Sequence, residues 1–139
     1  MIGLCSVTFR DDSVDYIIDL TKEAGIQAIE WSSDNHLPKN DIAQAEKVAQ
    51  LMQEAGLTTS SYGAYYKLGS FHDFEPFIQR YPLADGQDEW LQYIRTIEKE
   101  SQNKHHYLIE FVPGEDQKQG FLDSVATLKA WLFQLNIEY

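Results

Sequence analysis

The sequence predicts an α/β fold in which about four parallel strands are joined by amphipathic helices. Short apolar segments alternate along the chain with segments of helical periodicity. In addition, the tetrapeptides KEAG and QEAG, which end at Gly25 and Gly56, each stand where a helical pattern passes into a strand pattern. Repeated strand–helix units of this kind are typical of a parallel sheet with right-handed crossovers.

The individual elements follow from apolar periodicity and from capping residues. Strands are predicted at residues 2–5, 27–31, 57–62 and 107–112. Long helices are predicted between Ser13 and Gly25, between Asp41 and Gly56, around residues 90–97 and around residues 121–132. A further short helix is expected at residues 70–79, where Ser70 begins a weak capping box.

Length, charge and cysteine content narrow the class of protein. A chain of 139 residues suits one domain with a sizeable core. The net charge of −11 and the pI near 4.6 argue against nucleic-acid and anionic-membrane partners, both of which require a basic surface. The single cysteine, Cys5, suits a reducing compartment. We find no signal-peptide pattern and no apolar run of about 18 residues, so we expect a cytoplasmic protein.

The segment Gly25–His36, GIQAIEWSSDNH, is the most informative part of the chain. It combines the end of a helix, a strand that contains Glu30, and a polar loop. In parallel α/β folds the loops at the carboxyl ends of strands hold the functional site. A buried parallel strand is almost wholly apolar. Glu30 therefore requires either a polar partner or a function.

Several segments resemble the sugar phosphate isomerase/epimerase family, the xylose-isomerase-like TIM barrels. These segments are IGLCSVTFRD, KEAGIQAIEWSSDNHLP, EAGLTTSSYGAYYKLG and HHYLIEFV, the last followed by FLDSVATLKAWL. Residues 1–79 resemble the first three βα units, and residues 80–139 resemble the last helix–strand–helix part. Because a full barrel needs about 250 residues and eight strands, the resemblance implies a single-domain, incomplete barrel that lacks its middle.

The resemblance also implies a chemistry. In this family a divalent metal polarises the sugar oxygens, while acidic side chains move a proton next to the carbonyl. Of the implied Glu, Asp, His and Glu ligands of Mn²⁺, Mg²⁺, Zn²⁺ or Co²⁺, only the last has a matching position, Glu110. The resemblance thus predicts a sugar or sugar-phosphate isomerase/epimerase whose activity is impaired by the missing strands. The alternative is a non-catalytic remnant that binds a small polyol or a protein partner.

Glu30 and Glu110 are the candidate catalytic residues. Side chains alternate between the faces of a strand, so both carboxylates are expected on the face that a barrel would enclose. For Glu110 the alternatives are a vestigial metal ligand and an acid that is paired with Lys or Arg or left half-solvated. For Glu30 they are a polar contact to substrate and a hydrated acid at the edge of a pocket.

The candidate substrate contacts are His36, Tyr62, Tyr65 and Arg80. His36 lies in the loop after Glu30, where a histidine either contacts substrate or is simply solvated. The two tyrosines follow the third strand, where they either line a pocket or plug the end of the sheet. Arg80 is either a contact to a sugar or phosphate oxygen or a surface charge. We expect His36 and Tyr62 to face one cleft with the two glutamates.

Two strand arrangements are compatible with these elements. In the order 3-2-1-4, right-handed crossovers place the third long helix on the opposite face of the sheet, where it buries both glutamates. In the order 1-2-3-4, two half-barrels close into a dimer through the fourth strand of one chain and the first strand of its partner. We favour the second arrangement, and with it a homodimer.

Overall fold

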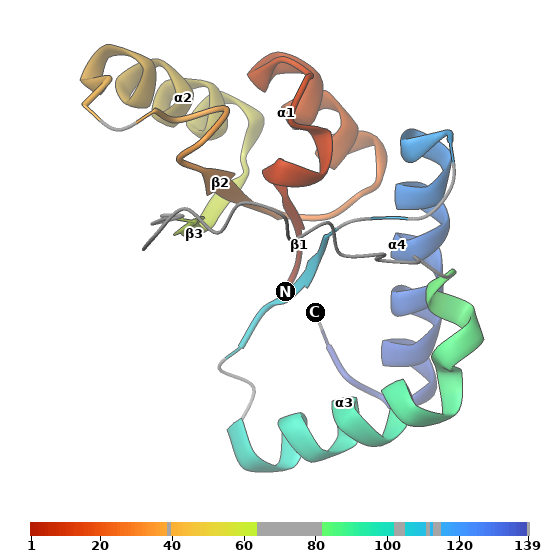
Figure 1. Cartoon of the computed structure of the whole chain (residues 1–139). Helices are drawn as coiled ribbons and strands as arrows, with labels where there is room; N and C mark the ends of the chain where they lie inside the picture. The colour runs from red at the N-terminus through yellow and green to blue at the C-terminus, as the bar shows by residue number, and fades with distance from the viewer. Residues whose placement is uncertain (39, 64–81, 102–104, 111, 113–114, 139) are drawn as a thin grey trace, which may run out of the picture.

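A computed structural model describes residues 1–38, 40–63, 82–101, 105–110, 112 and 115–138 (Figure 1). Its strands are β1 (Ile2–Cys5), β2 (Ala28–Ser32), β3 (Thr58–Gly63) and β4 (Tyr107–Ile109). Its helices are α1 (Val14–Glu23), α2 (Ile42–Ala55), α3 (Gln87–Ser101) and α4 (Gln117–Gln134), with short 3-10 turns η1 (Ser6–Phe9) and η2 (Leu83–Gly86). The predicted short helix at residues 70–79 lies outside the described residues.

All strand pairs are parallel, which confirms the predicted α/β class. The sheet has four strands in the order β3-β2-β1-β4. Our preference for the order 1-2-3-4 is therefore wrong, because β4 pairs with β1 of the same chain. The dimer route through β4 of one chain and β1 of another loses its basis, since that edge of β1 is already occupied.

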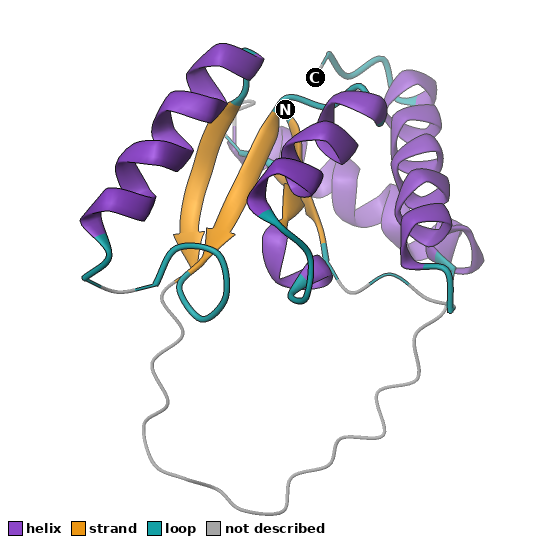
Figure 2. Cartoon of the chain, turned by 90° about the horizontal axis from the view of Figure 1, so that it is seen from above, coloured by secondary structure: helices purple, strands orange, loops and turns teal. Residues whose placement is uncertain are grey.

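The helices follow one another around the strands. α1 and α2 lie on one side of the sheet, and α4 lies beside β4. α3 lies on the opposite side of β4 from α1 (Figure 1). Seen from above, α2, α1 and α4 succeed one another across the molecule (Figure 2). The expectation that α3 would bury both glutamates is wrong, because Glu30 stays half-buried and Glu110 stays exposed.

The core fills the face of the sheet that α1 and α4 cover. Ile2, Leu4, Ile29 and Trp31 alternate along β1 and β2 and are each 0% exposed. Helical residues complete this core with large side chains, among them Ile17, Leu20, Phe121, Val125 and Leu132. The burial of these apolar side chains is the main contribution to the stability of the contact between the sheet and the helices.

Side chains and glycines fix most of the helix ends where the sequence predicts them. Ser13, Asp41 and Asp116 each accept a hydrogen bond from the backbone N–H three residues later. Gly25 and Gly56 adopt φ angles of 61° and 67°, the left-handed conformation that ends a helix at little cost for glycine. The predicted bounds therefore agree with α1 and α2 to within a few residues.

The fourth strand is shorter than predicted. Regular pairing stops at Ile109, so Glu110 lies just beyond the strand rather than inside it.

Among the described residues, we also find no helix with the length and apolar content needed to cross a membrane.

Candidate functional site

Strand register brings Glu30 beside a cysteine and a serine. Cys5 of β1 and Ser61 of β3 are both paired with Glu30 of β2. Their side chains share one face of the sheet, the face that faces away from the core. The Cys5 thiol donates to Glu30 Oε1 over 3.0 Å, and the Ser61 hydroxyl donates to Glu30 Oε2. Two donors therefore hold the Glu30 carboxylate near the carboxyl end of its strand.

Glu110 joins this face from the other side of β1. Gly3 is paired with Leu108, and Glu110 follows two residues later. The Glu110 residue is exposed as a whole, but partial burial of its carboxyl group raises the pKa of Glu110; the nearby charge of Glu30 raises it further, whereas a hydrogen bond with Cys5 lowers it. Glu30 and Glu110 thus flank Cys5 of β1 on the face of the sheet that strand alternation predicts for both, and the Cys5 thiol donates to Glu30.

Neither glutamate has a basic partner in the part of the chain that the structure describes. The ion pairs there join His105 to Glu98 and Lys118 to Glu23. The suggested pairing of Glu110 with Lys or Arg is therefore not observed among these residues. Two nearby carboxylates repel each other, and no cation among the described residues offsets this repulsion, which agrees with the raised pKa of Glu110.

The same group of residues does not match a site for a hard divalent metal. The described residues contain no group of three or more His, Cys, Asp or Glu side chains placed to hold a metal ion. A thiol and a hydroxyl beside two carboxylates also differ from the oxygen-rich set that Mg²⁺ or Mn²⁺ requires. The role of Glu110 as a metal ligand stays a prediction.

His36 does not face the two glutamates, so its predicted place in their cleft is wrong. Its side chain is 4% exposed and lies under the turn that follows β1. Nδ1 lies 3.1 Å from Ser6 Oγ, and Nε2 lies 3.2 Å from the carbonyl oxygens of both Phe9 and Asp12. Burial lowers the pKa of His36 against the opposing effect of these carbonyls. The imidazole therefore joins two loops inside the protein.

Tyr62 is also on the other side of the sheet, which corrects its predicted orientation. It is paired with Trp31, one position beyond the Glu30–Ser61 pair, so it points away from the glutamates. Its hydroxyl donates to the carbonyl oxygen of Leu37 over 2.9 Å. Tyr62 thereby fixes the loop between β2 and α2.

Tyr65 and Arg80 lie outside the described residues. Conversely, our sequence analysis missed Cys5 and Ser61 as partners of Glu30. The alternation of side chains along a strand tells which face of its own strand Cys5 or Ser61 occupies. Only the register between the strands shows that both residues lie beside Glu30.

A half-open cavity of about 330 Å³ adjoins Glu110. It lies among α3, β4 and α4, and its walls are mostly apolar. The buried walls include Ile94, Ile109, Val112, Leu128 and Trp131. Trp90, which is 45% exposed, and Glu110 stand on the solvent-exposed side. The same cavity is therefore lined both by the apolar side chains between the helices and by Glu110, one of the two glutamates.

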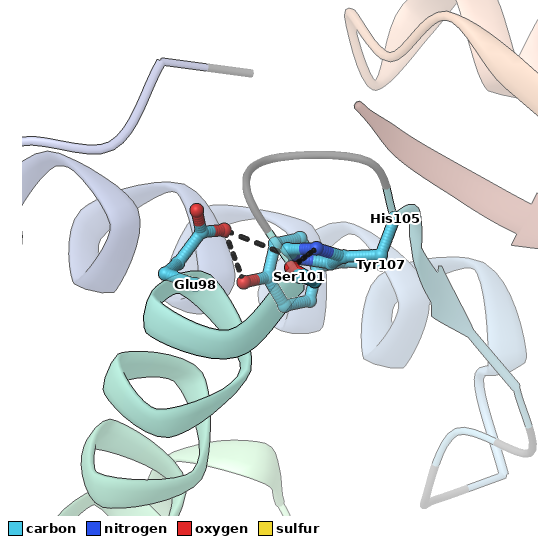
Figure 3. A network of polar contacts seen from close by, with 4 residues as sticks. All are labelled: Glu98, Ser101, His105 and Tyr107. Atoms are coloured by element: carbon cyan, nitrogen blue, oxygen red, sulfur yellow. Dashed lines mark hydrogen bonds and ion pairs between the residues drawn. The ribbon is translucent and has the colours of Figure 1, made fainter.

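A second polar cluster joins the end of α3 to β4 (Figure 3). Glu98 Oε1 accepts a 2.7 Å hydrogen bond from the Tyr107 hydroxyl and lies 3.0 Å from His105 Nε2. His105 Nδ1 lies 2.6 Å from the Ser101 hydroxyl. Burial and the bond to Glu98 raise the pKa of Tyr107. Ser101 is the last residue of α3, so His105 contacts the carboxyl end of this helix.

This cluster combines a serine, a histidine and a carboxylate, but its placement favours a structural role. Ser101 lies at the carboxyl end of α3, where carbonyl oxygens disfavour the negative charge that develops in acyl transfer. In addition, the N–H bond of His105 Nε2 does not point toward Glu98, so these two side chains form no hydrogen bond. We therefore assign the cluster to the attachment of α3 to β4.

Comparison with known proteins finds no match: no family model, no curated protein and no solved structure is significantly similar to this chain. The resemblance to the sugar phosphate isomerase/epimerase family thus stays a prediction, and the candidate site stands on its geometry.

Proposed function

We propose that the protein is a sugar isomerase/epimerase-like protein that moves a proton next to the carbonyl group of a small hydroxy-carbonyl compound. One observation supports this proposal above the others: Glu30 and Glu110 lie close together at the carboxyl ends of parallel strands, without a basic partner among the described residues. Two carboxyl groups side by side can act as base and acid, and the raised pKa of Glu110 suits this residue to the role of acid.

The proposed roles follow from the surroundings of each residue. Glu30, whose carboxyl group accepts two hydrogen bonds, is the base, and Glu110, whose pKa is raised, is the acid. Glu30 takes the proton from the carbon next to the carbonyl. The C–H electron pair then forms a C=C bond, the carbonyl electron pair moves to oxygen, and Glu110 protonates that oxygen. Glu30 then returns its proton to the former carbonyl carbon, while the hydroxyl on the neighbouring carbon gives its proton to Glu110 and becomes the new carbonyl group. Both carboxyl groups thereby regain their starting states.

A cytoplasmic location is supported by the single cysteine of the chain, Cys5, which is buried as a thiol. A divalent metal is not supported by the ligand set of the described residues. That limited set favours the second candidate function, a non-catalytic protein that binds a small polyol or a protein partner.

Solvent exchange tests the catalytic proposal directly. The full chain is incubated in D₂O with unphosphorylated and phosphorylated aldoses and ketoses, with and without Mn²⁺ or Mg²⁺, and loss of the C–H signal is followed by proton NMR. We expect exchange that falls by about 10²-fold or more in Glu30→Gln and in Glu110→Gln. Glu115→Gln, an exposed glutamate further along the same loop, is the matched control and keeps the wild-type rate. Wild-type exchange no faster than buffer would overturn catalysis and leave the binding function.

Carboxyl titration tests the pair without any substrate. Because the charge of Glu30 contributes to the raised pKa of Glu110, Glu30→Gln should lower the pKa of Glu110. Cys5→Ala should raise it, because it removes the hydrogen bond that opposes the shift. Carbon-13 NMR of the glutamate carboxyl groups measures both changes. An unchanged Glu110 titration in Glu30→Gln would show that the two groups do not interact.

A further inference from the structure

The cavity beside Glu110 offers a ligand very few polar groups. Three polar side chains in its wall already have partners inside the protein. Tyr107 donates to Glu98, Ser124 donates to the carbonyl oxygen of Gly120, and Trp131 donates to Gln87. The wall that remains is formed by aliphatic and indole groups. A ligand in this cavity therefore gains mainly from burial of its own apolar surface.

Two ionisable groups remain at the exposed side of this cavity, Glu110 and His106. The described lining contains neither lysine nor arginine. A phosphate or carboxylate ligand would therefore find no Lys or Arg partner among the described lining residues, and the net charge of −11 repels anions. A free sugar would leave most of its hydroxyl groups against apolar walls, where they lose hydrogen bonds to water.

We propose that the substrate of the Glu30–Glu110 pair is an uncharged hydroxy-carbonyl compound that carries an apolar group, with that group seated among Ile94, Leu128 and Trp131. This inference rests on the proposed function, because it names the substrate class of the same carboxylate pair. Glu110 connects the two features, since it lines the cavity and interacts with Glu30. Trp90, exposed at the rim, provides an aromatic surface for the substituent as it enters.

Calorimetric titration of the full chain tests this assignment with three probes. The probes are 2-hydroxyacetophenone, which combines a phenyl group with a hydroxy-carbonyl, dihydroxyacetone, which lacks the apolar group, and dihydroxyacetone phosphate. We expect 2-hydroxyacetophenone to bind at least about tenfold more tightly than dihydroxyacetone, because only its ring fills the apolar walls. The phosphate should bind no better than dihydroxyacetone.

Variants connect the binding to this cavity. Leu128→Trp fills it, and Trp90→Ala removes the aromatic rim at an exposed position where a loss of fold is not expected. Each should weaken 2-hydroxyacetophenone binding about tenfold, while far-UV circular dichroism checks the fold. Phe133→Ala removes an aromatic ring from the same helix as Leu128 at a site that is 82% exposed, so it should leave binding unchanged.

The outcomes separate this inference from the proposed function. Equal binding of the first two probes, tighter binding of the phosphate, or no effect of Trp90→Ala and Leu128→Trp would overturn the inference. If dihydroxyacetone exchanges its protons as fast as 2-hydroxyacetophenone, the proposed function stands and the substrate class falls. If 2-hydroxyacetophenone binds in the cavity without proton exchange, the ligand class stands and catalysis falls.

Discussion

His36 shows how far the surroundings of one residue depend on distant parts of the chain. Its ring contacts Ser6 and two backbone carbonyls that lie 24 and 27 residues away in sequence. All three contacts come from the segment after β1, which folds over the loop after β2. The sequence predicts that His36 contacts a substrate, but the structure shows that it is buried and connects two loops.

The burial of His36 predicts a specific loss of stability in acid. Its folded pKa lies below the ordinary value of 6.5. The buried ring of His36 stabilises the fold in its neutral form, so this stabilisation is fully present above pH 6.5. It is lost as the pH falls from 6.5 toward the folded pKa, because the unfolded chain then gains a proton more readily than the folded one. Each unit of pKa difference corresponds to about 1.4 kcal/mol. Urea unfolding of wild type and His36→Gln at pH 7.5 and 5.5 measures this, and the wild type should lose more stability.

Two results would bear on that prediction. His36→Gln should be the less stable protein at pH 7.5, because it cannot keep all three contacts of the imidazole. Equal losses between the two pH values in both proteins would show that the acid sensitivity comes from other groups.

At the scale of the elements, Gly3 marks the contact between β1 and its neighbours. A Cβ atom at this position would lie 2.7 Å from Leu108 Cδ2, 3.0 Å from the Ala28 carbonyl oxygen and 3.1 Å from Ala28 Cβ. β2 and β4 thus approach β1 so closely that a methyl group does not fit. The contact with Leu108 exists only because β4 lies beside β1.

Gly3→Ala should therefore destabilise the protein by about 1–3 kcal/mol through overpacking. Leu108→Ala should relieve part of this cost, whereas the contact with the Ala28 backbone should remain. Urea unfolding of both single variants and the double variant gives the coupling energy. A coupling energy of zero would contradict the β1–β4 pairing.

At the scale of the whole molecule, the strand order decides which edges are open. With β4 beside β1, the edges left open among the described residues belong to β3 and to the outer side of β4. α3 and α4 pack around β4, so this side is partly covered (Figure 1). The closed eight-stranded dimer requires a free edge on β1, and that edge is occupied.

We therefore expect sedimentation velocity at tens of micromolar to show a species of 16.0 kDa. Dilution over a hundredfold range should not change the sedimentation coefficient. A species of twice that mass would show that the chain associates through another surface, such as the β3 edge, and our initial expectation of a homodimer would then hold by a different route.

The sequence by itself determined the local structure of this protein. Apolar periodicity and capping residues predict α1, α2, α4 and the first three strands almost at their observed bounds, because these signals act within a few residues of each other. Strand alternation likewise places Glu30 and Glu110 on one face. β4 was predicted too long, since an apolar pattern does not show where pairing with a neighbour stops.

Only the tertiary structure decided the strand order, the partners of Glu30 and the fate of His36. Each of these depends on contacts between residues far apart in sequence: β1 with β4, Cys5 and Ser61 with Glu30, and the loop after β2 with the turn after β1. Periodicity cannot encode them, because the same alternating strand can pair with several neighbours and in several registers. The register of β1 with β2 and β4 brings the two glutamates to one face of the sheet, and residues of α3, β4 and α4 enclose the cavity beside Glu110.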